Sequence, residues 1–214
     1  MKQWTTSILL MVMIFCGLGS GCNEFLTVES QDELSRADLF STVRGADAAV
    51  VGLYRQLADG NYYQFRFPVY ADIQGNMAPT TNGGTVDPTA GLGARRAFGR
   101  LHGQDVTPEL LATGLPALYQ QAYTLLFQAN DVVDGLATLT EGSPEQLASL
   151  TAEARALRAV THFDLVRLFA QAPGFSAGAE HPGIALIDNI PGIFDLPARS
   201  SVAQVYAFII DDLE

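Results

Sequence analysis

The chain has 214 residues, of which 48% are hydrophobic and 16% are charged. This composition excludes a disordered or collagen-like chain and supplies enough apolar side chains for a folded core. The formal net charge of -11 disfavours nucleic-acid binding, because that function needs a basic surface to neutralise phosphates. The two cysteines, Cys16 and Cys22, exclude a disulfide-rich scaffold and cannot by themselves form a four-ligand metal site.

Residues 1–21 have the layout of a secretory signal peptide. Lys2 supplies a positive charge, residues 8–15 form an unbroken apolar run, and small residues lead up to Cys22. The run is too short to cross a membrane, which takes about 20 apolar residues. Small residues directly before a cysteine resemble the lipobox of bacterial lipoproteins, in which the cysteine receives lipid and begins the mature chain. Gly19 stands where that motif usually has leucine.

Two interpretations of Cys22 follow. In the first, residues 1–21 are a lipoprotein signal peptide and Cys22 carries lipid, such as palmitate. In the second, an ordinary signal peptide is cleaved near Gly21 and Cys22 stays free. We favour lipidation, because a single free thiol in an exported protein would invite unwanted pairing. Since the mature chain is acidic, anionic headgroups would repel it, and membrane contact would come from the lipid anchor.

Residues 22–36 are polar and acidic, which predicts a tether, and a helical domain is expected over 37–214. Within this domain, apolar residues at three- and four-residue steps predict a first helix over 37–59, ended by Gly60 and Asn61. Residues 62–108 have no sustained period and contain several prolines and glycines. They predict a long irregular loop of the kind that often carries function.

Three more helices are predicted after this loop. A mostly helical segment covers 108–140, with a kink near Gly114 and Pro116. The clearest helix covers 143–172: Ser143 and Gln146 form a capping box at its start, and residues 173–174 end it. A connector with a short strand at 184–187 leads to Ser200, which opens the last helix.

Glu214 lies inside the last predicted helix, and no glycine, proline or polar cap follows Leu213. We therefore expect an all-α fold of antiparallel helix pairs with one long irregular loop, incomplete at its C-terminal side. The apolar side of the last helix would then lack its partner surface. Its members are Val202, Val205, Ile209 and Leu213.

Three blocks of the chain resemble the RagB/SusD family of outer-membrane nutrient-binding lipoproteins. They are LYQQAY at 118–123 with Asn130 downstream, AEARALRA at 152–159 followed by FDLVRLF at 163–169, and RSSVAQVY at 199–206 followed by IIDDL at 209–213. The stretch CNEFLTVE at 22–29 is also similar to the family's mature N-terminus. The order and spacing of these blocks carry the resemblance over nearly the whole mature chain.

The resemblance implies tetratricopeptide-like helix pairs on a lipoprotein anchored at the cell outer membrane. It implies a nutrient ligand, expected to be a glycan, and a TonB-dependent SusC-like transporter as partner, with this protein sitting as a lid over the transporter's barrel. It implies no catalysis and no cofactor. Family members are considerably longer, so residues 37–214 look like the N-terminal part of such a protein, either as a fragment or as a truncated copy.

The residues themselves offer no catalytic or metal-binding motif. His102, His162 and His181 lie far apart, and neither a zinc-binding H-E-x-x-H nor a Gly-x-Ser-x-Gly motif is present. The adjacent Asp211 and Asp212 would point apart on a helix, which argues against an acid/base pair. We therefore expect no enzyme and no metal site.

Aromatic residues crowd the segment 62–70, and polar residues follow it. The rings could form a sugar platform, with Tyr70, Asp72 and Asn76 as the candidate ligand-binding residues. They could instead fill a small satellite core under the loop, which is the interpretation we favour for the cluster as a whole.

Several polar residues on the predicted helices are expected to be structural rather than ligand-binding. Asn130, Glu153 and Arg158 would satisfy polar groups at helix contacts, and His162 would be packed. If the chain binds no nutrient, the alternative function is a helical-repeat scaffold, an adaptor lipoprotein that binds protein partners only.

Overall fold

The computed structural model describes residues 35–74, 115–190, 192 and 194–214, with the backbone alone for 71–74. The long helices are α3 (Val43–Leu57), α7 (Leu115–Thr138), α8 (Pro144–Phe169) and α9 (Val202–Leu213). The shorter helical elements are α2 (Arg36–Leu39), α4 (Arg66–Gln74) and the 3-10 turns η1 (Pro173–Phe175) and η2 (Ala177–Ala179). Two strands, β1 (Pro182–Ala185) and β2 (Arg199–Ser201), complete the elements of these ranges.

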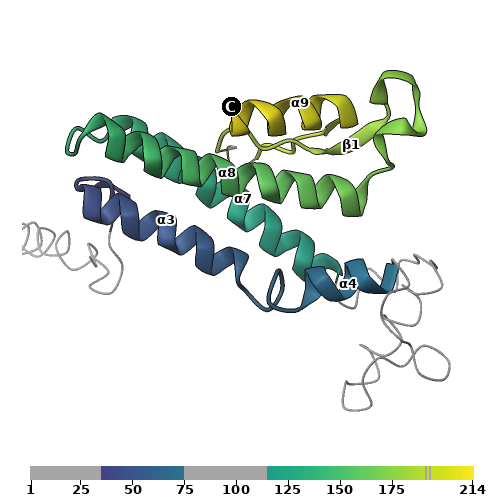
Figure 1. Ribbon diagram of the computed structural model, residues 1–214, viewed down its shortest axis with the longest axis horizontal. Helices are drawn as coiled ribbons and strands as arrows, with labels where there is room; N and C mark the ends of the chain where they lie inside the picture. Colours follow the sequence, from purple (N-terminus) through teal and green to yellow (C-terminus); the bar gives the residue numbers. More distant parts are fainter. Residues whose placement is uncertain (1–34, 75–114, 191, 193) are drawn as a thin grey trace, which may run out of the picture. The chain divides into compact units, whose positions relative to one another are not determined.

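Helix α8 lies in the middle of the unit that begins at Ala37, with α3 and α7 on one side and α9 on the other (Figure 1). The contacts fix the directions of the helices. The backbone N–H of Val43 donates to Glu141, just after α7, whereas Gln121 near the start of α7 donates to the carbonyl of Gln56 near the end of α3 (3.1 Å). Helices α3 and α7 are therefore antiparallel.

The other helix pairs follow the same arrangement. The short connection at 139–143 turns the chain back from α7 into α8. Helix α9 runs antiparallel to α8, because Asp212 at its end bonds Arg158 while Tyr206, earlier in α9, contacts Phe163 further along α8. The predicted all-α fold of antiparallel helix pairs is confirmed. None of the helices in the described ranges is long and apolar enough to cross a membrane.

The predicted first helix, 37–59, is interrupted near its start. Helix α3 begins at Val43 because the side chain of Thr42 accepts a hydrogen bond from the backbone N–H of Gly45, which caps the helix there. A Cβ on Gly45 would lie 2.0 Å from the carbonyl oxygen of Leu39, so the turn between α2 and α3 requires glycine. The predicted apolar period is confirmed at Ala46, Val50 and Leu53, which are all buried.

Helix α8 buries residues on two sides, which fits its central position. Leu150, Leu157 and Leu165 belong to the apolar core, and His162 and Arg158 are buried as well. The predicted capping box is present, with reciprocal hydrogen bonds between Ser143 and Gln146. The helix ends at Phe169, before the predicted stop, because Ala170 is already extended.

The predicted strand at 184–187 lies two residues earlier, as β1, and pairs antiparallel with β2, which the apolar pattern did not indicate. A second capping box, between Ser201 and Gln204, starts α9 one residue later than expected. The expectation that the apolar side of α9 lacks a partner is wrong for most of that side. Val202, Val205 and Ile209 are buried and only Leu213 is exposed, because the stripe packs against α8 and the strands.

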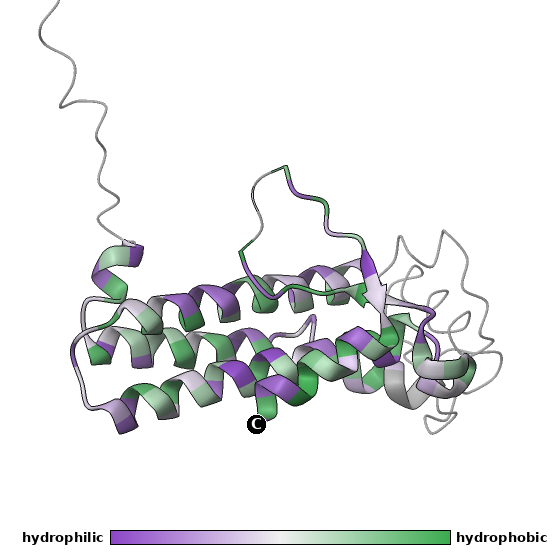
Figure 2. Cartoon of the chain, turned by 90° about the horizontal axis from the view of Figure 1, so that it is seen from above, coloured by the Kyte–Doolittle hydropathy of each residue, from purple (hydrophilic) through white to green (hydrophobic). Residues whose placement is uncertain are grey.

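Each helix carries both apolar and polar residues around its axis, as expected when part of its surface packs inward and part faces solvent (Figure 2). Within the expected loop 62–108, residues 66–74 form the helix α4, and the part from 75 onward lies outside the described residues. The tether 22–36 lies almost wholly outside them, as do Cys22 and the predicted signal peptide.

Candidate functional site

The aromatic segment before α4 is attached to α8 through one carboxylate. The hydroxyls of Tyr62 and Tyr63 both donate to Oδ2 of Asp164, at 2.9 and 2.8 Å. Burial raises the pKa of Asp164, while the two hydrogen bonds and nearby Arg167 act in the opposite direction. Because the paired residues are about a hundred positions apart, this contact fixes where the chain enters α4.

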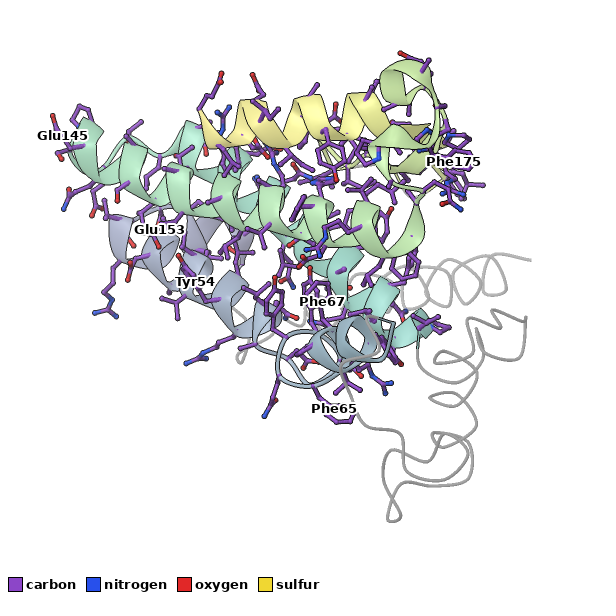
Figure 3. All side chains as sticks on the ribbon, turned by 45° about the vertical axis from the view of Figure 1, so that its right-hand side comes forward. Tyr54, Phe65, Phe67, Glu145, Glu153 and Phe175 are labelled. Carbon is purple, nitrogen blue, oxygen red and sulfur yellow. The ribbon has the colours of Figure 1, made fainter. Side chains whose placement is uncertain are left out.

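The rings of this segment pack on one another. Tyr63 stacks on Phe67 with centroids 5.0 Å apart, and Tyr62 meets both rings edge-on. Phe67 points toward the helices, whereas Phe65 points away from them (Figure 3). Tyr62 belongs to the main apolar core and Phe67 packs against it, whereas Tyr63 is 37% exposed. The rings therefore join the main core, and the prediction of a separate satellite core is wrong.

Of the three predicted ligand-binding residues, Tyr70 is the one whose side chain the structure describes. Tyr70 is only 4% exposed, and its hydroxyl accepts a hydrogen bond from Nη1 of Arg66 at 3.3 Å. Asp72 lies on α4, but its side chain is outside the described residues, as is the whole of Asn76. A binding role for these three residues stays a prediction.

A buried polar network joins three helices. Arg158 on α8 donates from Nε and Nη2 to the two carboxylate oxygens of Asp212 on α9, at 2.7 and 2.5 Å. Its Nη1 donates to Oδ1 of Asn130 on α7. The amide of Asn130 in turn donates to the carbonyls of Leu126 and Ile187, both at 3.0 Å. The structural roles predicted for Asn130 and Arg158 are confirmed.

Asp212 is the partner that sequence reasoning missed. From the sequence, Asp212 stands out only as the neighbour of Asp211, with which no acid/base pair is expected. A signal was present, since Asp212 follows Val202, Val205 and Ile209 at helical steps and so lies on the buried side of α9. Glu153, in contrast, accepts a hydrogen bond from the hydroxyl of Tyr54 at 3.0 Å near the surface.

His162 extends the network toward the connector after β1. Its Nδ1 donates to the carbonyl of Arg158 at 3.0 Å, and its Nε2 accepts from the backbone N–H of Ile187 at 3.2 Å. Burial lowers the pKa of His162 to about 4, so the ring is neutral at physiological pH. His162 is packed, as expected, and it holds the connector in place.

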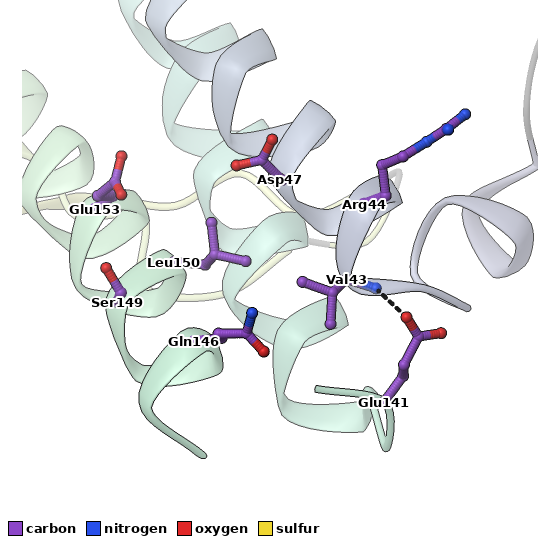
Figure 4. Close-up of a pocket in the computed structure, with 8 residues that line it drawn as sticks. All are labelled: Val43, Arg44, Asp47, Glu141, Gln146, Ser149, Leu150 and Glu153. Atoms are coloured by element: carbon purple, nitrogen blue, oxygen red, sulfur yellow. Dashed lines mark hydrogen bonds between the residues drawn. The ribbon is translucent and has the colours of Figure 1, made fainter. Parts of the chain in front are cut away.

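An open pocket of about 550 Å³ lies between the start of α3 and the start of α8 (Figure 4). Asp47, Glu141 and Glu153 make its rim acidic, and Val43 and Leu150 supply apolar surface. No group of three or more potential ligands that could hold a metal occurs in the described part of the chain.

This helical architecture is shared with known proteins. Residues 24–214 match the family of SusD-like proteins described as "Starch-binding associating with outer membrane". A crystal structure of a SusD superfamily protein from Bacteroides thetaiotaomicron is similar with a TM-score of 0.64 at 20% identity. A second, from Bacteroides vulgatus, is similar with a TM-score of 0.64 at 27% identity. No curated protein gives a match.

Each of these two similarities covers 80% of this chain but 36% of the solved one. The chain therefore spans about a third of the length of the structures that it resembles. The solved structures support the fold, and the match over 24–214 takes in all four long helices. On these grounds the chain belongs to the SusD-like family of starch-binding proteins that associate with the outer membrane.

Proposed function

We propose that this chain belongs to a lipoprotein of the outer-membrane surface that binds a nutrient, namely a glycan, and delivers it to a TonB-dependent SusC-like transporter. The observation that carries the proposal is the family match over residues 24–214, because the family is described as starch-binding and outer-membrane associated. The proposed role is binding and hand-over, with no catalytic step, so the glycan would be recovered intact.

The lipid anchor is supported by the sequence around Cys22, which stands just before the matched region. Metabolic labelling with a palmitate analogue tests it in the native membrane. We expect label on the wild-type protein and none on Cys22→Ala. Labelling that persists in the variant, or is absent from the wild type, would refute the anchor.

Glycan binding is tested on the full chain with an array of neutral and acidic oligosaccharides, followed by calorimetry on the strongest ligand. Binding of at least one glycan, recovered unhydrolysed, is the expected result. Delivery is tested by co-purification from outer membranes, where a TonB-dependent transporter is the expected partner. If no array member binds, nutrient capture by this chain is refuted.

A helical scaffold that binds protein partners only is the second candidate. The burial of Tyr70 favours it, because a ring that is 4% exposed presents no face to a sugar. A chain that co-purifies with a transporter or another protein, yet binds no glycan, would support the scaffold over nutrient capture.

A further inference from the structure

A groove of about 650 Å³ runs along α7 beside β1 and the segment before β2. Its volume falls within the range of ligand pockets, about 300–1,000 Å³. The lining residues are Pro116, Tyr119, Gln120, Tyr123, Thr124, Phe127, Ala185, Ile187, Leu196 and Pro197. Neither the aromatic residues of 62–67 nor Tyr70 is among these lining residues.

Three rings follow one another along the floor of this groove at steps of four residues: Tyr119, Tyr123 and Phe127. Tyr119 is 41% exposed and Phe127 is 38% exposed, so both present ring surface to solvent. The eight residue steps from Tyr119 to Phe127 correspond to about 12 Å along the helix axis. That length suits a ligand with more than one ring.

The first two rings are held in position without a ligand. Tyr119 packs on Tyr123 with centroids 4.4 Å apart and meets Phe169 edge-on at 5.3 Å. The hydroxyl of Tyr123 donates to the carbonyl of Ala185 in β1 at 3.0 Å. Side chains that are already ordered lose little freedom on binding, which favours affinity.

The groove differs from the rest of this acidic chain in its charge. Among the described residues that line it there is no Asp, Glu, Lys, Arg or His, although the formal net charge of the chain is -11. The charge of Arg199 acts on Tyr123, but the Arg199 side chain is held by the carbonyls of Gly183 and Phe169.

The polar groups beside the rings are the exposed amide of Gln120, which can donate and accept hydrogen bonds, and the half-buried hydroxyl of Thr124. Because the Thr124 hydroxyl donates to the carbonyl of Gln120 at 2.9 Å, it is left to accept a hydrogen bond from a ligand. Uncharged rings beside neutral hydrogen-bonding groups match a ligand that is itself uncharged, with apolar faces and hydroxyl edges.

We propose that this groove is a saccharide-binding site in which the rings of Tyr119 and Phe127 stack on the apolar faces of neutral sugar units, with Gln120 and Thr124 bonding their hydroxyls. The assignment rests on the proposed function, glycan capture, and adds the location and the neutral class of the ligand. A protein partner with an apolar surface is the competing occupant, and the experiment below separates the two.

The test uses the full chain and a panel of neutral oligosaccharides that includes maltoheptaose, a linear fragment of starch, measured by calorimetry. Tyr119→Ala and Phe127→Ala should each weaken binding about tenfold or more. Tyr119→Phe keeps the ring and should bind as the wild type does. Phe175→Ala is the matched control, because Phe175 is an exposed ring on η1, outside the groove. Binding should change little with salt, since a neutral ligand has no charge to screen.

Each outcome either supports the groove as the saccharide site or rules it out. If the wild type binds a neutral saccharide and the two alanine variants bind it equally well, the groove is not the site, while glycan capture stands. If the wild type binds none of this neutral panel, the assignment fails; the proposed function fails with it only if the acidic glycans of the array do not bind either. If the variants lose a co-purifying protein but keep the saccharide, the groove is a protein interface. Thermal unfolding checks each variant, and Phe127→Ala decides alone if Tyr119→Ala unfolds, because Tyr119 also packs on Phe169.

Discussion

Gly135 on α7 packs directly against the ring of Phe40. A Cβ at this position would lie 2.5 Å from two atoms of that ring, and Phe40 is itself buried. The contact explains a glycine in the last turn of a long helix, since glycine within a helix otherwise costs up to about 1 kcal/mol relative to alanine. Close approach of the segment before α3 to α7 depends on it.

Gly135→Ala is therefore expected to destabilise the chain by about 1–3 kcal/mol, through overpacking against Phe40. Gly52→Ala on α3 is the matched control, since nothing lies within 4 Å of its Cβ position. That variant should be more stable than the wild type by about 0.5–1 kcal/mol, the usual gain in a helix interior. Urea unfolding of both variants measures the difference, and equal effects would contradict the close contact.

His162 makes stability depend on pH in one direction. Its pKa is about 4 in the folded chain and about 6.5 when unfolded, so the unfolded chain binds the extra proton between these values. The contribution of His162 to the free energy of unfolding is fully present above about pH 6.5. It falls by on the order of 3 kcal/mol as the pH drops toward 4.

Urea unfolding at pH 7 and pH 5 measures this dependence, and the variant His162→Gln isolates it. The amide can still accept from the N–H of Ile187 but does not titrate, so the loss of stability between the two pH values should shrink. An unchanged pH dependence in the variant would show that other groups cause it.

At the scale of elements, side chains that bond the backbone set the helix boundaries. Thr42 starts α3, and capping boxes start α8 and α9. The box at Ser143 was recognisable because Pro144 follows it, whereas the apolar period alone placed the start of the first helix too early. Strand β2 was missed because three residues carry no period, and its partner is far along the chain.

The capping box of α9 should contribute measurably to stability. Ser201→Ala removes the acceptor for the N–H of Gln204 and should destabilise the chain by about 1 kcal/mol. Ser149→Ala, at an exposed interior position of α8, should not destabilise the chain and should raise its stability by about 0.5 kcal/mol at most, because alanine is the better helix former. Thermal unfolding compares the two variants. Similar midpoints would mean that the strand pairing at Ser201, rather than the cap, holds the start of α9.

At the scale of the whole molecule, the fold class followed from the sequence because four long helices each carry an apolar stripe with a helical period. The polar interior did not follow in the same way. The pairing of Arg158 with Asp212 spans 54 positions, and nothing in either helix alone names its partner. The groove on α7 was also missed, because the residues that line it come from separate stretches of the chain, 116–127, 185–187 and 196–197.

The pair Arg158–Asp212, with Asn130, connects α7, α8 and α9, so its loss should destabilise all three helices. Removing one partner leaves a buried charge, and Arg158→Met or Asp212→Leu alone should destabilise the chain by about 3–5 kcal/mol. The double variant should lose clearly less than the sum, because no unpaired charge remains. Arg155→Met is the control, since Arg155 is more exposed and lies 3.9 Å from Asp212; its effect should stay below about 1 kcal/mol.

Urea unfolding of these variants gives the coupling energy between the two residues. Following it both by far-ultraviolet circular dichroism and by tyrosine fluorescence shows whether the helices and the tyrosine environments unfold together. A coupling of about 1–3 kcal/mol, with the two signals changing together, would show that one buried ion pair joins the helices into a single cooperative unit. Additive losses would instead mean that the apolar stripes hold the helices together and that the ion pair adds only local stability. Because His162 connects this pair to the residues lining the groove on α7, the first result would also predict looser saccharide binding in the single variants.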